Sequence, residues 1–133
     1  MSERIIKVIY IEDNPANLAL VVRLLESTGR FKVLGAPDGE SGLELIEAEL
    51  PDVVLVDLDI PGSNGFEVTR RIKASPNPRV ASIPVAAVSA NVMQNEQAAS
   101  LDAGCQIFIE KPFDINWFRA TVAQLAGLGD DSH

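Results

Sequence analysis

Residues 52–56 read DVVLV, and Asp57 follows directly. A short apolar run rich in β-branched residues and without polar alternation is typical of a strand that is covered on both faces. Residues 31–36 (FKVLGA) form a weaker run, in which Lys32 indicates a place nearer the edge of a sheet. Three further runs have the character of the first: residues 5–11 (IIKVIYI), 83–88 (IPVAAV) and 106–109 (QIFI). The sequence therefore predicts five strands.

Between the strands, apolar residues recur at helical spacing. Helix-starting residues predict five helices, which begin near Asn14, Asp38, Asn64, Asn91 and Asp114. The apolar positions expected to face the sheet are Leu18, Val22, Leu25, Leu43, Ile46, Leu50, Val68, Ile72, Ile115, Phe118, Val122 and Leu125. This alternation of strand and helix predicts an α/β fold, a doubly wound parallel sheet with helices on both faces.

Two segments between the strands are less regular. The segment 91–103 has only a thin apolar stripe, so the helix there is expected to be loosely held. Residues 75–78 (SPNP) are expected to form a loop that ends the third helix.

Composition limits the class of protein. The 133 residues carry a formal net charge of −8 and are 47% hydrophobic, which suits a single domain, expected over residues 1–128 with a frayed polar tail over 129–133. The acidic balance disfavours binding to nucleic acid or to anionic lipid, because both need clustered Lys and Arg. No apolar stretch approaches the roughly 20 residues of a membrane span, and the only cysteine, Cys105, is expected to be small core filler. We therefore expect a cytoplasmic protein.

Polar residues stand directly after four of the predicted strands. They are Glu12 and Asp13 after the first, Asp57 and Asp59 after the third, Ser89 after the fourth, and Lys111 after the fifth. The carboxyl ends of parallel strands lie at one edge of the sheet, where ligands bind. Taken singly, each of these residues is explained as well by a helix cap or a turn, but their joint placement favours a site.

The chemistry of these residues suits a phosphoryl group. Carboxylates gathered at one edge repel each other unless a cation is bound among them, and oxygen ligands favour a hard ion such as Mg²⁺. Lys111 adds a second positive charge and Ser89 a hydroxyl donor. Asp57, held at the tip of a buried strand, is placed to attack phosphorus and form an aspartyl-phosphate.

Four stretches closely resemble the receiver domain of two-component response regulators, the CheY-like family. They are IYIEDN (9–14), VLVDLDIPGSNG (54–65), VAAVSAN (85–91) and IFIEKPF (107–113). The resemblance covers Ile5 to about Ala126 and implies a flavodoxin-like fold with the strand order 2-1-3-4-5.

The resemblance also implies a role for each acidic residue. Asp57 corresponds to the phosphoacceptor, and Glu12 and Asp13 to the acidic pair that holds Mg²⁺ together with the Asp57 side chain. The backbone carbonyl of Asp59 corresponds to a further metal ligand. The Asp59 side chain is a departure, because other members carry varied and often uncharged residues there. Its carboxylate is expected either to tune metal affinity and the attack of water on the phosphoryl group, or to be a solvated loop residue.

Three further residues take their roles from the same resemblance. Ser89 corresponds to the switch position that bonds a phosphoryl oxygen, and Lys111 to the lysine typical of the family, with a cis bond to Pro112. Phe108 occupies the aromatic switch position, where many relatives carry Tyr. Without a hydroxyl, Phe108 can pack inward but cannot form a new hydrogen bond.

The implied function is a phosphoacceptor in two-component signal transduction. It takes a phosphoryl group from a histidine kinase or a histidine phosphotransferase, and catalyses only its own phosphorylation and dephosphorylation. Its output surface, around the fourth helix, the fifth strand and the fifth helix, meets a downstream protein target or a second copy in a homodimer. A free-standing response regulator is expected, because no output segment follows Leu128; a receiver excised from a hybrid histidine kinase is the alternative.

Two other classes share part of the pattern. Asp57-Leu58-Asp59 mimics the nucleophile motif of haloacid-dehalogenase-type phosphohydrolases, but those enzymes place their metal-binding acids downstream, and here the acidic pair lies upstream. A flavodoxin-like binder of flavin phosphate needs amide and hydroxyl donors after the first strand, where Glu12 and Asp13 would repel an anion.

Helical geometry makes a prediction about Trp117, the only tryptophan. Each residue advances by about 100° around the helix axis, which gathers Phe118, Val122 and Leu125 on one face and turns Trp117 away from them. We expect a partly exposed indole that serves as a candidate partner surface. A ring lying flat over a neighbouring loop is the alternative.

Overall fold

The computed structural model describes residues 5–59, 65–90 and 94–129. Within these ranges the chain forms five strands, β1 Ile6–Ile11, β2 Phe31–Ala36, β3 Val53–Asp57, β4 Val85–Ser89 and β5 Ile107–Glu110. The helices in the same ranges are α1 Pro15–Glu26, α2 Gly39–Glu49, α3 Gly65–Lys73, α4 Pro78–Ala81, α5 Gln94–Ala103 and α6 Ile115–Gly129. All five predicted strands are present. The predicted helix starts at Asn64 and Asn91 lie outside the described residues.

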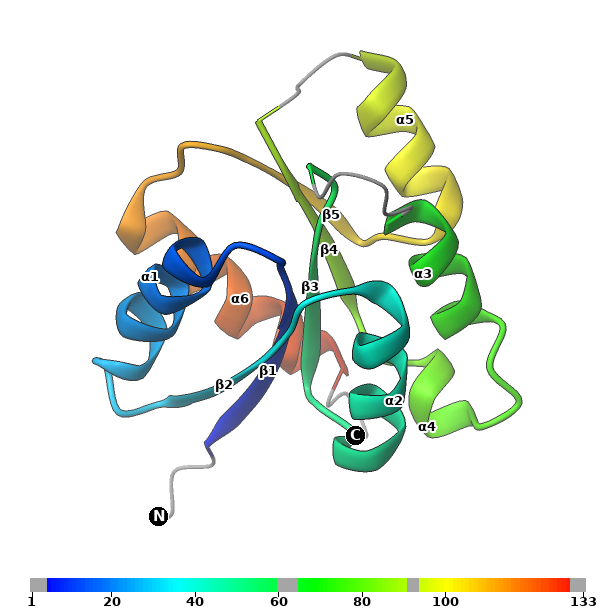
Figure 1. The fold of residues 1–133 in the computed structure, drawn as a ribbon, viewed down its shortest axis with the longest axis horizontal. Coiled ribbons are helices and arrows are strands. Elements are labelled where there is room, and N and C mark those ends of the chain that lie inside the picture. The colour runs from blue at the N-terminus through cyan, green and yellow to red at the C-terminus, as the bar shows by residue number, and fades with distance from the viewer. Residues whose placement is uncertain (1–4, 60–64, 91–93, 130–133) are drawn as a thin grey trace.

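The strands form one parallel sheet in the order β2-β1-β3-β4-β5, which confirms the predicted architecture. β3 lies at the centre of the sheet and all five of its residues are buried. β2 lies at an edge, as its exposed Lys32 indicated. Helices α1 and α6 cover one face of the sheet, and α2, α3, α4 and α5 lie on the other side (Figure 1).

The two faces of the sheet bury two separate apolar clusters, because successive strand residues point to opposite faces. In β1, Val8 packs in the cluster under α1 and α6, whereas Ile9 and Ile11 pack in the cluster under α2 and α3. Successive residues of β1 therefore meet opposite layers of helices. This is why the predicted strands lack polar alternation.

Helix α1 begins at a cap that the sequence predicts. The Asn14 side chain accepts hydrogen bonds from the backbone N–H groups of Ala16 and Asn17, and Pro15 occupies the first turn. Asp38 caps α2 in the same way by accepting a bond from the Ser41 N–H. These caps fix where the chain turns back after the strands.

Three details differ from the sequence-based expectation. Pro78, expected to be the last residue of the loop 75–78, instead starts the short helix α4, which Asn77 caps. Ile115, expected in the buried stripe of the last helix, is 44% exposed because it is the first residue of α6 and lines an open groove beside α1. Helix α6 runs to Gly129, one residue into the expected tail, and residues 130–133 lie outside the described ranges.

The exposure of the last two helices agrees with the other expectations. Phe118, Val122 and Leu125 are buried, and Trp117 is 44% exposed, as helical geometry predicted. In α5, Leu101 is 55% exposed, whereas Ser100 and Ala103 are buried, so the thin apolar stripe is confirmed for these residues. No helix of the described ranges is long and apolar enough to span a membrane.

The contrast between α5 and α6 predicts unequal contributions to stability. Phe118→Ala removes a fully buried ring that stacks on Phe113 and should lower the free energy of unfolding by about 3–5 kcal/mol. Leu101→Ala, on the exposed side of α5, should change it by less than about 1 kcal/mol. Urea unfolding of the two variants beside the wild type measures both values. Equal losses would contradict this description of the two helices.

Candidate functional site

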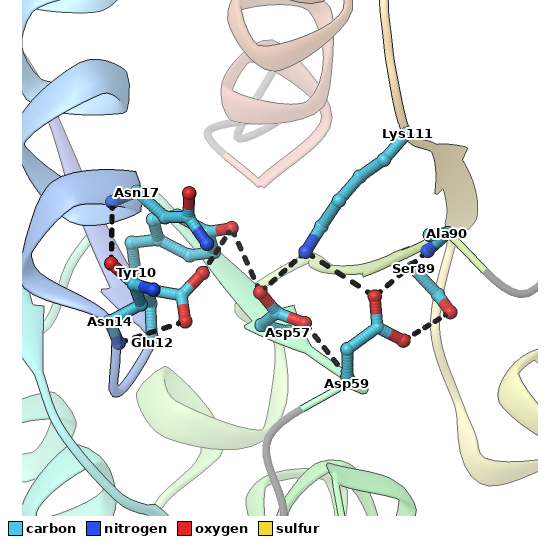
Figure 2. A network of polar contacts seen from close by, with 9 residues as sticks. All are labelled: Tyr10, Glu12, Asn14, Asn17, Asp57, Asp59, Ser89, Ala90 and Lys111. Carbon is cyan, nitrogen blue, oxygen red and sulfur yellow. Dashed lines mark hydrogen bonds and ion pairs between the residues drawn. The ribbon is translucent and has the colours of Figure 1, made fainter.

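Residues from four strands meet at the carboxyl edge of the sheet (Figure 2). Five of the predicted residues take part in one polar network: Glu12 after β1, Asp57 and Asp59 at and after β3, Ser89 at the end of β4, and Lys111 after β5. Two of the carboxylates are almost without solvent contact, Glu12 at 4% and Asp57 at 2% exposure. The network joins residues that lie far apart in the sequence, because the strand order places β3 between β1 and β4.

Asp57 is held by donors on both of its carboxylate oxygens. The backbone N–H of Asp59 donates to Oδ1 over 2.8 Å, and Lys111 Nζ donates to Oδ2 over 2.8 Å. The hydroxyl of Tyr10 donates to the same Oδ2 over 3.4 Å. The carboxylate of Asp57 is therefore fixed in position, and its charge faces one ammonium group.

Lys111 is the cation of this network. Partial burial lowers the pKa of its ammonium group, but the hydrogen bond and the charge of Asp57, together with Asp59, outweigh burial and raise that pKa above its ordinary value. Lys111 therefore stays charged throughout the physiological range of pH.

Glu12 lies against Asp57 on the other side of the network. Tyr10 donates its hydroxyl to Glu12 Oε1 over 3.3 Å, and the Asn14 N–H donates to Oε2 over 3.1 Å. Burial, followed by the hydrogen bond to Asp57, raises the pKa of the Glu12 carboxyl to about 7. Two buried carboxyl groups in contact do not both ionise easily, and this shared excess of negative charge favours a bound cation.

Tyr10 belongs to the site, although the sequence analysis treated it as part of an apolar strand. Its ring packs in the cluster under α1 and α6, and its hydroxyl reaches both Glu12 and Asp57. Burial and the two carboxylates raise the pKa of the Tyr10 phenol, so the group remains a donor. The signal was in the sequence: Tyr10 precedes Glu12 by two positions, and alternate residues of a strand share a face. A buried tyrosine hydroxyl also needs a partner.

The Asp59 side chain lies in the turn after β3, where it is partly exposed and is bound by three donors. Ser89 Oγ donates to Oδ1 over 2.8 Å, and the backbone N–H of Ala90 donates to Oδ2 over 2.9 Å. Lys111 Nζ lies 3.4 Å from the same Oδ2. Burial raises the pKa of Asp59, but these donors outweigh burial and lower that pKa below its ordinary value. The backbone of Ala90 has no signature in sequence, so this contact could not be read from it.

The remaining predicted residues lie outside this network. Asp13 is exposed and is not part of the contacts in Figure 2. Phe108 is half-buried and packs against the cluster under α2 and α3. The Lys111–Pro112 bond is cis, as predicted.

The donor set fits a hard divalent cation better than a softer metal. Residues 5–59, 65–90 and 94–129 contain no group of three or more His, Cys, Asp or Glu side chains that could hold a metal by themselves. The carboxylates of Glu12 and Asp57 offer oxygen ligands only, and Mg²⁺ is commonly bound by one or two carboxylates while it keeps several waters. The chemistry of the site is therefore compatible with Mg²⁺.

Comparison with known proteins defines the class. A family model described as the response regulator receiver domain matches residues 8–123. The chain belongs to this family, and it is a receiver domain of two-component signal transduction. The haloacid-dehalogenase alternative is therefore not favoured.

Two curated relatives differ greatly in length. The sensor histidine kinase GacS of Pseudomonas protegens is 34% identical over 129 residues, which are 96% of this chain but only 14% of GacS. The polar-differentiation response regulator DivK of Brucella anthropi is 32% identical over 120 residues, which are 90% of this chain and 95% of DivK.

Solved structures confirm the fold. The receiver domain of a sensor histidine kinase from Pseudomonas aeruginosa, with a magnesium ion coordinated in its active site cleft, has a TM-score of 0.81 at 28% identity. The alignment covers 92% of this chain and 98% of that domain. The chemotaxis response regulator CheY4 of Vibrio cholerae has a TM-score of 0.80 at 19% identity, over 91% of this chain and 98% of CheY4, which shows the shared fold.

The raised pKa of Glu12 predicts how stability depends on pH when divalent metal is removed. The folded state holds a proton up to about pH 7, whereas an ordinary glutamate loses it near 4.5, so this carboxyl makes the protein less stable as the pH rises between those values. Glu12→Gln removes that loss. Its stability relative to the wild type should therefore increase from about pH 5 to about pH 8.

Urea unfolding in the presence of a chelator measures this difference. Glu44→Gln, which neutralises an exposed carboxylate on α2, serves as the control and should show no such trend. If Glu12→Gln changes the free energy of unfolding by the same amount at about pH 5 and about pH 8, the prediction is wrong.

Proposed function

We propose that Asp57 is the phosphoacceptor of this receiver domain and takes its phosphoryl group from a histidine kinase or a histidine phosphotransferase. The observation that supports this most is the Asp57 carboxylate itself, which is 2% exposed, ends the central strand and is paired with Lys111 Nζ at 2.8 Å. In the reaction, an Asp57 oxygen forms a bond to phosphorus. The bond from phosphorus to the imidazole nitrogen of the donor breaks, and its electron pair leaves with the imidazole.

The surrounding residues lower the barrier by holding charge in place. Lys111 would neutralise negative charge on the oxygens of the phosphoryl group as it reaches Asp57. The N–H of Asp59 fixes the orientation of the Asp57 carboxylate. The hydroxyl of Ser89 is at hand as a further donor. Outside its own phosphorylation and dephosphorylation, we propose no catalytic activity for the domain.

We infer that Mg²⁺ is the cofactor, as in the receiver domain from Pseudomonas aeruginosa. The carboxylates of Glu12, Asp13 and Asp57 and the backbone carbonyl of Asp59 would hold the ion, with Asp13 on the exposed side of the site. Bound there, Mg²⁺ would neutralise part of the charge of the phosphoryl oxygens. The buried pair Glu12 and Asp57 supports this, because one ammonium group faces several carboxylates.

An apolar groove beside the site is the place where we propose that the phosphodonor docks. The groove has a volume of about 550 Å³ and lies between α1 and the segment that leads from β5 into α6. Leu20 and Ile115 line it and are 52% and 44% exposed. Tyr10 and Lys111, both in contact with Asp57, line it as well. A donor helix seated in this groove would bring its histidine close to Asp57.

We propose that α5, β5 and α6 form the output surface, which binds the partner. Trp117 on α6 is exposed, and α5, whose apolar stripe is thin, carries the exposed Leu101. These features support binding of a downstream protein target or of a second copy, whereas the formal charge of −8 argues against direct contact with nucleic acid. The cytoplasm is the compartment we propose, in keeping with the buried free thiol of Cys105.

Phosphorylation of Asp57 predicts a defined covalent product. Incubation with acetyl phosphate and Mg²⁺ should add one acid-stable, alkali-labile phosphoryl group, which intact-mass spectrometry detects. Asp57→Asn should abolish it, and Asp13→Asn should slow it severely because a carboxylate near the metal is lost. Asp102→Asn, on the exposed surface of α5, removes the same charge away from the site and should be labelled like the wild type. Undiminished labelling of Asp57→Asn would refute the assignment.

The docking groove predicts a difference between two residues of α6. Ile115 and Trp117 are equally exposed at 44%, but only Ile115 lines the groove. With any histidine kinase that phosphorylates the wild type, Ile115→Ala should lower the rate of transfer by about tenfold, as expected for a lost interface anchor of about 1.4 kcal/mol. Labelling by acetyl phosphate should stay unchanged. Trp117→Ala should be phosphorylated normally by both donors; equal effects of the two substitutions on kinase transfer would exclude the groove as the docking site.

A further inference from the structure

We propose that the Asp59 carboxylate is an internal ligand of the donors that bind the phosphoryl group, and that it must leave them before they can bind this group on Asp57. This inference rests on the proposed function of Asp57. It assigns to the Asp59 side chain a role as a competitor within the same molecule.

The carboxylate of Asp59 lies in a cradle of three donors, defined here as Ser89 Oγ, the Ala90 N–H and Lys111 Nζ. Their distances to the Asp59 oxygens are 2.8, 2.9 and 3.4 Å (Figure 2). A hydroxyl, a backbone amide and an ammonium group that converge from two strand ends are the donors that bind anions in protein sites. The cradle is thus an anion-binding site, and in this protein a side chain fills it.

The cradle adjoins the proposed phosphoacceptor. Lys111 Nζ lies 2.8 Å from Asp57 Oδ2 while it also faces Asp59, so both carboxylates share one cation. The two residues are also linked through the Asp59 N–H, which donates to Asp57 Oδ1 over 2.8 Å. A phosphoryl group attached to Asp57 would therefore reach the donors that Asp59 occupies.

The two anions compete for the cradle. The Ser89 hydroxyl and the Ala90 amide each have one hydrogen to donate, and a phosphoryl group beside the Asp59 carboxylate would place like charges in contact. Asp59 can move away, because its side chain is 35% exposed, whereas that of Asp57 is 2% exposed. The donors are available to the phosphoryl group only for the fraction of time in which Asp59 has left them. The apparent affinity is therefore the intrinsic affinity multiplied by that fraction.

Beryllofluoride, a stable mimic of the phosphoryl group, measures this competition. We expect Asp59→Ala to bind it about tenfold more tightly than the wild type, which corresponds to a cradle that is open about one tenth of the time. Asp59→Asn, which keeps an acceptor oxygen but loses the charge, should lie between the two. Asp102→Asn removes one charge from the exposed surface of α5 and should bind like the wild type. Affinities are measured by NMR titration with Mg²⁺ saturating for each variant.

Hydrogen exchange at the Ala90 amide tests the occupied cradle without any phosphoryl chemistry. In metal-free protein, the exchange of this amide should be faster in Asp59→Ala than in the wild type or in Asp102→Asn, because its acceptor is gone. Unchanged exchange would overturn the inference. So would unchanged or weaker beryllofluoride binding by Asp59→Ala. If neither the wild type nor any variant binds beryllofluoride or accepts a phosphoryl group, the proposed function of Asp57 is wrong. The exchange rate of the Ala90 amide would still show whether Asp59 occupies the cradle.

Discussion

The burial of the Asp57 carboxylate is the constraint from which the arrangement of the site follows. A carboxylate that is 2% exposed is strongly destabilising unless donors and a cation replace the lost water. Here the replacements are the Asp59 N–H, the Tyr10 hydroxyl and the Lys111 ammonium group. They come from β1, from the turn after β3 and from the segment after β5, and the parallel sheet brings all three to its carboxyl edge. The fold therefore stabilises a charge that a less ordered loop would leave in water.

The compensation of this charge is incomplete in the metal-free protein. Lys111 faces two carboxylates, Asp57 and Asp59, and Glu12 adds a third acidic group that is 4% exposed. Burial first, and then the contact with Asp57, raise the pKa of the Glu12 carboxyl to about 7 in the metal-free protein. A divalent cation would relieve this excess, and it would at the same time bring positive charge to the oxygens of an incoming phosphoryl group. The same uncompensated negative charge would therefore favour both the binding of a metal ion and the proposed phosphoryl transfer to Asp57.

The sequence predicted the parts of the structure that repeated physical patterns determine. Strand positions followed from apolar runs, because β1 and β3 meet a helical layer on each face, and the edge position of β2 followed from Lys32. The helix α4 was missed because four residues are too few for an apolar period. Ile115 was misplaced because helical spacing gives the direction of a side chain but not whether a neighbouring element covers it.

Within the site, residue types and their strand-end positions were sufficient to gather Glu12, Asp57, Ser89 and Lys111, but not to find the role of Tyr10. A tyrosine in an apolar strand looks like core, and only the positions of Glu12 and Asp57 show that its hydroxyl has acidic partners. The Asp59 side chain was left between two interpretations for a similar reason. Its partners are a hydroxyl and an amide that follow a different strand, so the contact depends on the register of β3 and β4, where Asp57 lies beside Val88.

The bond between Ser89 and Asp59 also bears on what the unphosphorylated state is. A site of this kind would be expected to leave its hydroxyl and amide donors to water until a phosphoryl group arrives. Here Asp59 already draws Ser89 Oγ to 2.8 Å, and Ser89 ends β4, the strand that neighbours β5. The carboxyl end of β4 is therefore tied to β3 by an internal anion. Under the proposed function, phosphorylation of Asp57 would exchange one anion in the cradle for another of higher charge. The signal would then lie in the difference between these two occupied states and not in the filling of an open cradle.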